Sequence, residues 1–93
     1  MSIPADVENP VVSGCPQGNQ NFLSENPDRM PVQWSVPTFT DNDKMQPVVP
    51  YVNGEAQSEL TEITVGIHDI KYVGRDVSGN EATCEFKVTI SSK

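Results

Sequence analysis

One alternating stretch near the end of the chain constrains the fold more than any other feature. Every second residue there is apolar: Cys84, Phe86, Val88 and Ile90. The residues between them are polar, and this period of two is typical of a strand with one dry and one wet face. Ile70, Tyr72 and Gly74 alternate in the same way, and residues 76–80 are rich in residue types that tolerate positive φ. Together these segments predict an antiparallel hairpin.

Two shorter patterns upstream predict further strands. Residues 32–36 alternate around Trp34 and predict a half-buried strand that ends at Pro37. Residues 60–65 predict another extended segment, because Thr and Ile favour strands, and Gly66 predicts the turn that follows it.

A proline-containing segment is predicted to lie at a sheet edge. Residues 48–52 are apolar, but Pro47 and Pro50 cannot donate ladder hydrogen bonds, which makes this segment either an edge strand or an irregular one. Asn53-Gly54 predicts a turn directly after it. Since unpaired backbone groups at an edge invite strand addition, we expect a partner to bind there, unless the prolines block it.

The first half of the chain carries weaker signals. Residues 11–15 predict a first strand, and residues 16–31 predict mostly loop, with a short extended piece at Phe22-Leu23. Residues 38–46 predict a polar loop. About six or seven short strands without helical periodicity predict an all-β sandwich. The residues expected in its core are Trp34, Ile70, Tyr72, Phe86 and Val88.

The two cysteines, Cys15 and Cys84, lie near opposite ends of the chain. Small domains bury a modest share of their surface and often need a covalent staple. The even count and the inward position of Cys84 favour a Cys15–Cys84 bridge, which implies an oxidising compartment. Two buried free thiols in a cytosolic protein are the alternative. A metal–thiolate cluster is not expected, since there is no Cys-x-x-Cys pair and His68 is the only histidine.

Composition limits what the chain binds. Its 93 residues make one domain with 6 basic and 13 acidic residues, a formal net charge of −7, which disfavours nucleic acid and anionic lipid as partners. There is no apolar run of about 18 residues, so we expect no membrane insertion. The first ten residues lack a signal-peptide pattern. We expect residues 1–10 to be a linker or a segment added for expression, and residues 11–91 to form the domain.

Catalysis is not expected. His68 and Asp69 are the types found in a catalytic triad, but none of the eight serines lies in a nucleophile-elbow context. No glycine-rich phosphate loop joins a strand to a helix. A solvent-facing strand histidine is the simpler interpretation of His68.

Calcium binding by the acidic loops is a more specific alternative than catalysis. Two groups of side chains offer hard oxygen ligands: Asp41, Asn42 and Asp43, and then Asp76, Ser78 and Asn80. The Asp-x-Asp-x-Asp-Gly pattern is missing, and Asp and Asn in such loops commonly cap turns. We therefore expect turn capping and no cofactor, with Asp41, Asp43 and Asp76 as the candidate calcium ligands.

In this order the residues resemble the hyalin repeat, or HYR domain, an extracellular immunoglobulin-like module. Cys15-Pro16 resembles the family's opening Cys-Pro, and residues 32–42 resemble its central Val-x-Trp…Pro…Asp-Asn stretch. The other matches are to its Gly-x-x-x-Val-x-Tyr segment and its Asp-x-Ser-Gly-Asn…Cys-x-Phe-x-Val ending: Gly66, Ile70, Tyr72, Asp76, Ser78, Gly79, Asn80, Cys84, Phe86 and Val88. The resemblance implies an immunoglobulin-like antiparallel β-sandwich of about seven strands, with one disulfide joining the first and last strands.

Two segments depart from the family pattern. Ile63-Thr64 stands where Phe-Pro is common before the central Gly, and Gly74 stands where an Ala is usual two residues after the Tyr. True immunoglobulin domains share the Cys…Trp…Cys order, but the Tyr expected two residues before their second Cys is Ala82 here.

The resemblance also implies a function. It indicates a non-catalytic module of a larger secreted or cell-surface protein, acting in cell adhesion or matrix assembly and binding other protein modules or matrix proteins. A carbohydrate-binding accessory module of a secreted enzyme is one alternative; it requires exposed aromatic rings, and the alternation around Trp34 and Tyr72 argues against them. A calcium-dependent adhesion module is the other.

Overall fold

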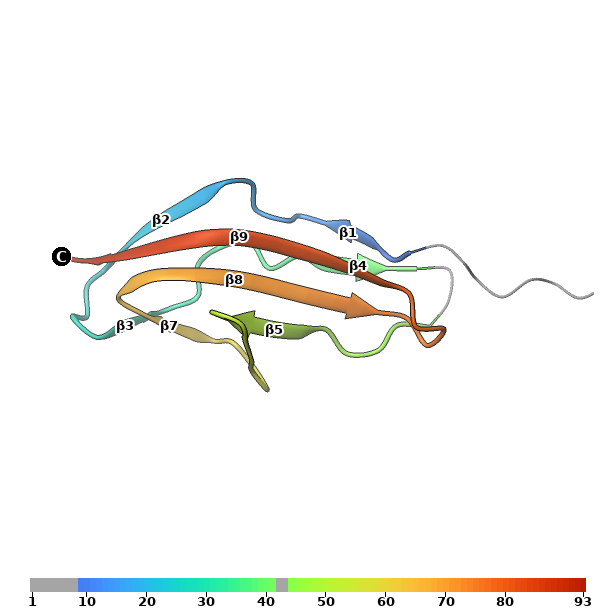
Figure 1. The fold of residues 1–93 in the computed structure, drawn as a ribbon. Helices are drawn as coiled ribbons and strands as arrows, with labels where there is room; N and C mark the ends of the chain where they lie inside the picture. Colours follow the sequence, from blue (N-terminus) through green and yellow to red (C-terminus); the bar gives the residue numbers. More distant parts are fainter. Residues whose placement is uncertain (1–8, 42–43) are drawn as a thin grey trace, which may run out of the picture.

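The computed structural model describes residues 9–41 and 44–93, and in these ranges the chain forms nine strands and no helix (Figure 1). The strands are β1 (Val11–Ser13), β2 (Asn19–Ser24), β3 (Arg29–Pro31), β4 (Thr38–Thr40), β5 (Val49–Val52), β6 (Glu55–Ala56), β7 (Glu62–Thr64), β8 (Gly66–Arg75) and β9 (Glu81–Ser92). The all-β class is confirmed. Over the described ranges, no helix long and apolar enough to cross a bilayer is found.

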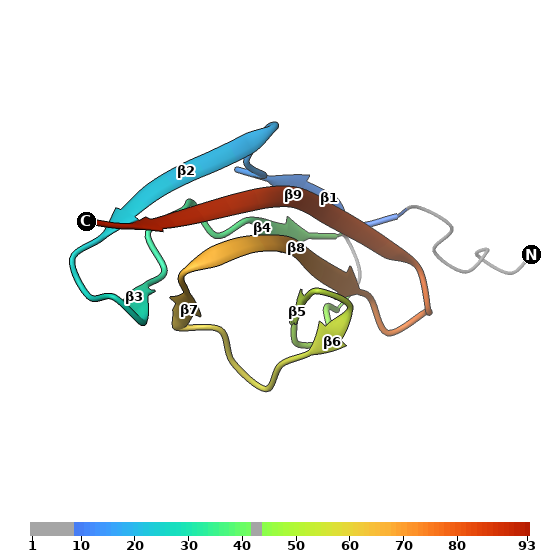
Figure 2. The same cartoon turned by 60° about the vertical axis from the view of Figure 1, so that its left-hand side comes forward.

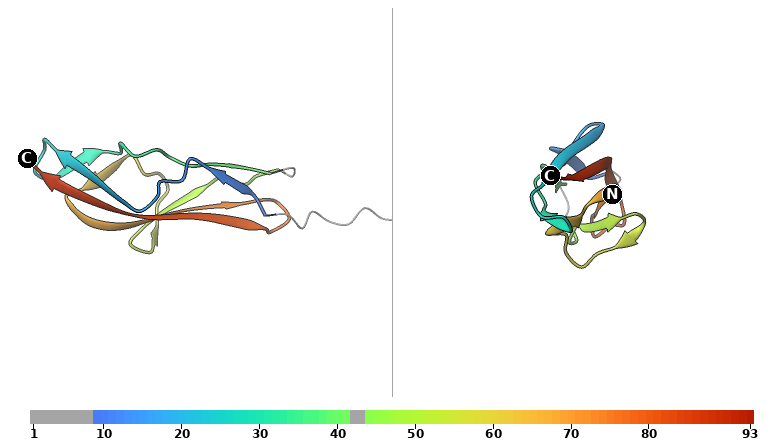
Figure 3. Two further views of the ribbon diagram at one scale, coloured as in Figure 1. Left: turned by 90° about the horizontal axis from the view of Figure 1, so that it is seen from above. Right: turned by 90° about the vertical axis from the view of Figure 1, so that its left-hand side faces the viewer.

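The strands form two layers (Figures 1 and 3). One layer is a five-stranded sheet in the order β2-β9-β8-β5-β6, and the other contains the pairs β1–β4 and β3–β7. In this second layer β3 pairs with β7, and β4 pairs with β1. This arrangement confirms the predicted sandwich.

The β8–β9 hairpin is the longest pairing in the molecule, and the sequence predicted it correctly. Its antiparallel ladder covers ten residue pairs and sets Tyr72 opposite Cys84 and Ile70 opposite Phe86. The alternating positions Ile70, Tyr72 and Gly74 of β8 and Cys84, Phe86, Val88 and Ile90 of β9 are buried, which follows from the two-residue period of their sequences.

The core lies between the hairpin and the opposite layer. All five predicted core residues are buried there: Trp34, Ile70, Tyr72, Phe86 and Val88. From the other layer, Met30 of β3 and Ile63 of β7 face each other in the ladder and close the core. Burial of these apolar side chains is the main stabilising term for such a small sandwich.

The crossing from β1 to β2 is where the sequence interpretation was incomplete. β1 belongs to one layer and β2 to the other, and Gly14 and Gly18, both with positive φ, flank the crossing. The chain changes layer without reversing direction, so β2 pairs with β9 in parallel. The expectation of purely antiparallel pairing is therefore wrong at this edge. The extended piece predicted at Phe22-Leu23 is confirmed as part of β2, but the rest of residues 16–31, predicted as loop, also contributes to β2 and contains β3.

The segment around Trp34 also differs from its prediction. Residues 32–36 were expected to form a strand, but they are irregular although Trp34 is buried. Pro31 and Pro37 flank the segment and donate no hydrogen bonds, and Val32 N–H makes one isolated bond to the Thr61 carbonyl, at 2.9 Å. The loop expected over residues 38–46 begins instead with strand β4.

Strand β5 is not at the sheet edge. It pairs with β8 on one side and with the two-residue β6 on the other, because a turn at Asn53-Gly54 returns the chain beside it. Both turn residues have positive φ, 52° and 86°, as expected for a tight hairpin turn. The predicted edge position of this strand is thus wrong, and its turn is confirmed. Gly66, predicted as a turn, is the first residue of β8 and has a φ of 138°.

Candidate functional site

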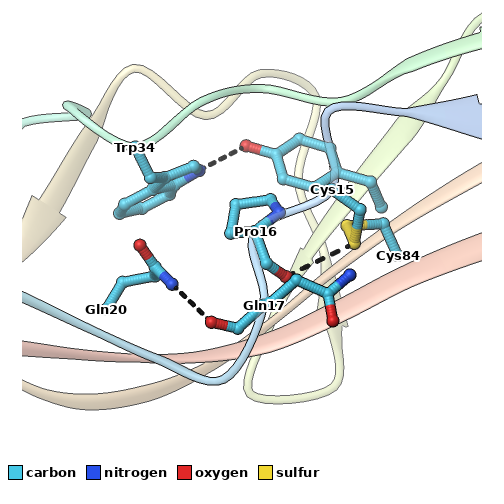
Figure 4. Close-up of a disulfide and its surroundings, with 7 residues drawn as sticks. Cys15, Pro16, Gln17, Gln20, Trp34 and Cys84 are labelled. Atoms are coloured by element: carbon cyan, nitrogen blue, oxygen red, sulfur yellow. Dashed lines mark hydrogen bonds between the residues drawn. A yellow bond between two sulfur atoms is a disulfide. The ribbon is translucent and has the colours of Figure 1, made fainter.

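The bridge predicted between Cys15 and Cys84 is present (Figure 4). The two sulfur atoms are 1.97 Å apart and the two Cα atoms 5.7 Å apart. Cys84 is on the inward face of β9 and is 1% exposed, whereas Cys15 lies two residues after the end of β1, in the crossing to β2. The disulfide therefore fixes the point where the first strand changes layer against the last strand.

An aromatic cluster packs beside the bridge. Trp34 Nε1 donates a buried hydrogen bond of 3.0 Å to the Tyr72 hydroxyl (Figure 4), and the Trp34 and Phe86 rings meet edge to face, with centroids 5.8 Å apart. Burial raises the pKa of the Tyr72 hydroxyl, and the bond from Trp34 partly offsets the rise. Trp34 and Tyr72 are only 5% and 4% exposed, so neither ring is available to stack on a sugar.

The turn after β8 is organised around Asp76, whose side chain is fully buried. Its Oδ1 accepts hydrogen bonds from the backbone N–H of Ser78 and Asn80, at 3.0 and 2.9 Å, and its Oδ2 accepts from Asn80 Nδ2 at 3.1 Å. Burial alone would raise the pKa of Asp76, but hydrogen bonds with Asp41, Asn80 and Ser78 outweigh it and lower the pKa. The carboxylate is thus committed to the turn, the arrangement of an Asx cap.

The calcium candidates are only partly brought together. Asp41 and Asp76 share a side-chain hydrogen bond, although they are 35 residues apart. Asn42 and Asp43 lie outside the described residues. In the rest of the chain, no group of three or more His, Cys, Asp or Glu side chains is arranged to hold a metal ion.

His68 and Asp69 belong to a structural network on β8. His68 Nε2 lies 2.9 Å from the Thr64 carbonyl, to which it donates, so Nδ1 accepts from Asn53 Nδ2 at 3.1 Å. The amide oxygen of Asn53 in turn accepts from the Asp69 N–H at 2.9 Å. These bonds tie the β5–β6 turn to β8 through the His68 side chain and the Asp69 backbone.

One packing contact was missed by the sequence interpretation. Phe39, in the segment predicted to be a polar loop, lies directly over Gly74, and a Cβ at that glycine would overlap the Phe39 ring. The departure from the family pattern at Gly74 is therefore matched by an aromatic residue in the opposite layer. A glycine inside a strand pattern, which often marks a close approach, was the available signal.

Comparison with known proteins places the chain in a family. The model of the HYR domain matches residues 5–90, nearly the whole chain and both cysteines. No curated protein and no solved structure matches it significantly. HYR domains are non-catalytic, immunoglobulin-like repeats of extracellular proteins, in keeping with the disulfide and the two-layered sheet. The chain belongs to the HYR domain family.

Proposed function

We propose that this chain is an extracellular module that spaces and connects its neighbours in a larger adhesion or matrix protein. The observation that carries the proposal is the position of the two chain ends. β1 enters at one end of the sandwich and β9 leaves at the other (Figure 2), while the Cys15–Cys84 bridge joins these two segments inside the domain. Copies of such a module connect end to end.

The outer face of the five-stranded sheet supports a role in protein contact. It carries a ladder of opposite charges, in which Lys87 Nζ is 3.8 Å from Asp69 Oδ1 and Arg75 pairs with Glu81. At the end where the chain leaves, Leu23 and Ile67 are 64% and 67% exposed. The Tyr51 ring on this face is half-buried, and Lys71 Nζ lies over it, 5.6 Å from the ring centroid. The mixed surface therefore fits a polar protein interface better than a sugar, which stacks on exposed aromatic rings.

Secretion of the chain tests the extracellular part of the proposal. The chain is fused to a eukaryotic secretion leader, and the medium is treated with a thiol-alkylating reagent before and after reduction. We expect two thiols to become reactive only after reduction. Free thiols in the secreted chain, or its retention in the cell, would contradict an extracellular role. The same chain made in the cytosol, expected to react without reduction, is the control.

A tandem construction tests the spacing part. Two copies are joined through the first ten residues of the second copy, and small-angle scattering measures the maximum dimension. We expect about twice the dimension of a single copy, because the chain enters and leaves at opposite ends. A maximum dimension close to that of one copy would show that the modules fold back on each other and would exclude the spacer role.

A further inference from the structure

We infer that the Cys15–Cys84 bridge makes this module a load-bearing link, in which tension between the chain ends passes through the disulfide and bypasses the fold between the two cysteines. The inference rests on the proposed function, since it requires tension from neighbouring modules. It follows from the position of the bridge in the topology and from the direction of the strands that the bridge joins.

The loaded path is short and already extended. From the entry end, β1 leads along the long direction of the sandwich to Cys15, the bridge crosses to Cys84, and β9 continues in the same direction to the exit end (Figures 1 and 2). A β-strand is close to the maximum length of its chain. Pulling at the two ends therefore meets a nearly taut path, and little length remains to be released.

The rest of the domain lies off this path. The cysteines are separated by 69 positions, and the chain between them is closed into a loop by the bridge. This loop contains β2 to β8 and two rings of the aromatic cluster, Trp34 and Tyr72, whereas Phe86 lies on the loaded part of β9. Tension applied at the ends cannot extend it while the bridge is intact, so the surface formed by these strands keeps its shape under load.

A second resistance is built into the edge of the sheet. β2 and β9 run parallel and pair over six residues, from Asn19 opposite Lys87 to Ser24 opposite Ser92. When the bridge is reduced, the entry end pulls β2 backward while the exit end pulls β9 forward. All the hydrogen bonds of this ladder are then loaded together in shear, rather than opened one after another. The reduced module is expected to yield only after this ladder breaks.

Single-molecule force measurements test the inference on the native, oxidised chain, held at its two ends between marker domains. Without a reductant, we expect no extension step from the residues between the cysteines. With dithiothreitol present, a thiolate attacks one sulfur and the other leaves as a thiolate, which opens the loop. Once the β2–β9 ladder has also broken, the 69 positions between the cysteines release about 250 Å at about 3.6 Å per residue.

The force dependence of reduction shows whether the S–S bond carries the tension or lies off the loaded path. At dithiothreitol concentrations where the rate of the 250 Å step is proportional to the concentration, reduction limits the step and rupture of the β2–β9 ladder does not. This rate is expected to rise with the applied force, because tension along the S–S bond favours its cleavage. As a matched control, the chain is held instead at Lys93 and at Glu55, the first residue of β6, through a linkage that uses no thiol. The direct chain from Glu55 to Cys84 then carries the tension and the bridge does not. Because reduction releases no length between these two points, it is followed by labelling the new thiols of the held molecule with a fluorescent maleimide, and its rate should not depend on force.

Three outcomes would overturn the inference: a full-length step without reductant, a reduction rate that does not depend on force between the chain ends, or the same force dependence in the control geometry. None of these measurements depends on where the protein is found. A free-thiol secreted chain would instead contradict the proposed function while leaving the mechanics of the oxidised chain intact, so the two failures are distinguishable.

Discussion

Replacement of Gly74 by alanine tests how tightly the two layers of the sandwich meet. Gly74 is buried in β8, and Phe39 of β4 covers it from the other layer. A Cβ built on Gly74 would overlap the Cβ, Cγ and Cδ2 atoms of Phe39. Gly74→Ala therefore forces either the ring or the β4 backbone to move.

The expected effect is the difference between two opposing terms. Overpacking a close-packed core costs about 1–3 kcal/mol. Replacing glycine by alanine also restricts the unfolded chain, which stabilises the folded state by about 0.4–1 kcal/mol where the conformation is compatible, and Gly74 has no positive φ. The overpacking cost prevails, and the net loss is about 1–2 kcal/mol. For a domain of this size that corresponds to a fall in Tm of about 4–16 °C.

Urea unfolding of a double-mutant cycle separates the overlap from any other effect. Phe39→Ala removes the ring and costs packing by itself, but it also removes most of the obstacle to Gly74→Ala. We expect the double variant to lose at least about 1 kcal/mol less than the sum of the two single losses. Strict additivity, or a Gly74→Ala variant as stable as the parent, would refute the proposed overlap.

The other predictions concern the bridge, the aromatic cluster and the Asp76 turn. Reducing the disulfide should lower the free energy of unfolding by about 4 kcal/mol, from the loop entropy of 69 positions, and urea titration showing a loss under about 1 kcal/mol would contradict this. Tyr72→Phe leaves the Trp34 indole N–H buried without its acceptor and should cost about 1–3 kcal/mol in urea titration, against little for the outer-face control Tyr51→Phe. Because the folded-state pKa of Asp76 is below its ordinary value near 3.8, its carboxylate stabilises the fold above that pH and loses this effect as the pH falls through the folded value. The stability difference between the parent and Asp76→Asn should therefore narrow between pH 5 and pH 2, and a constant difference in urea titrations would contradict the assignment. Millimolar calcium should leave the thermal midpoint equal to that in chelator, since the described residues contain no group of three or more acidic side chains arranged to hold a metal ion, and a midpoint that rises with calcium would restore the calcium-dependent alternative.

The C-terminal half of the fold could be predicted because its signals are local. In β8 and β9 the side-chain period, the turn residues and the pairing all lie within one hairpin, so the pattern that buries Cys84 and Phe86 also sets their partners. The bridge was predictable for the same reason, since the inward position of Cys84 followed from that pattern. Asn53-Gly54 likewise determines a tight turn by its own backbone preference.

Alternation of apolar and polar residues indicates which side chains are buried, but not whether the backbone pairs with another strand. This explains why the strand predicted over residues 32–36 is absent. The residue is buried, as its pattern predicts, but Pro31 and Pro37 remove donors on both sides and the segment joins no ladder. The opposite error occurred at β2. Five of its six residues are polar or exposed, and its strand conformation comes from pairing with β9 rather than from any apolar period of its own.

Strand β9 lies between the part of the fold that local sequence patterns predict and the part that they do not. On one edge it pairs with β8, its neighbour in sequence, and on the other with β2, from the opposite end of the chain. The pairing between Phe22 and Ile90 closes a long loop, whose entropic cost no local contact offsets. The parallel direction of β2 then follows from a crossing that leaves the chain direction unchanged, a property of the assembled sandwich. The Cys15–Cys84 bridge attaches the chain to β9 beside this crossing. The β2–β9 pairing, which the sequence did not predict, therefore lies next to the disulfide, which the two cysteines did predict.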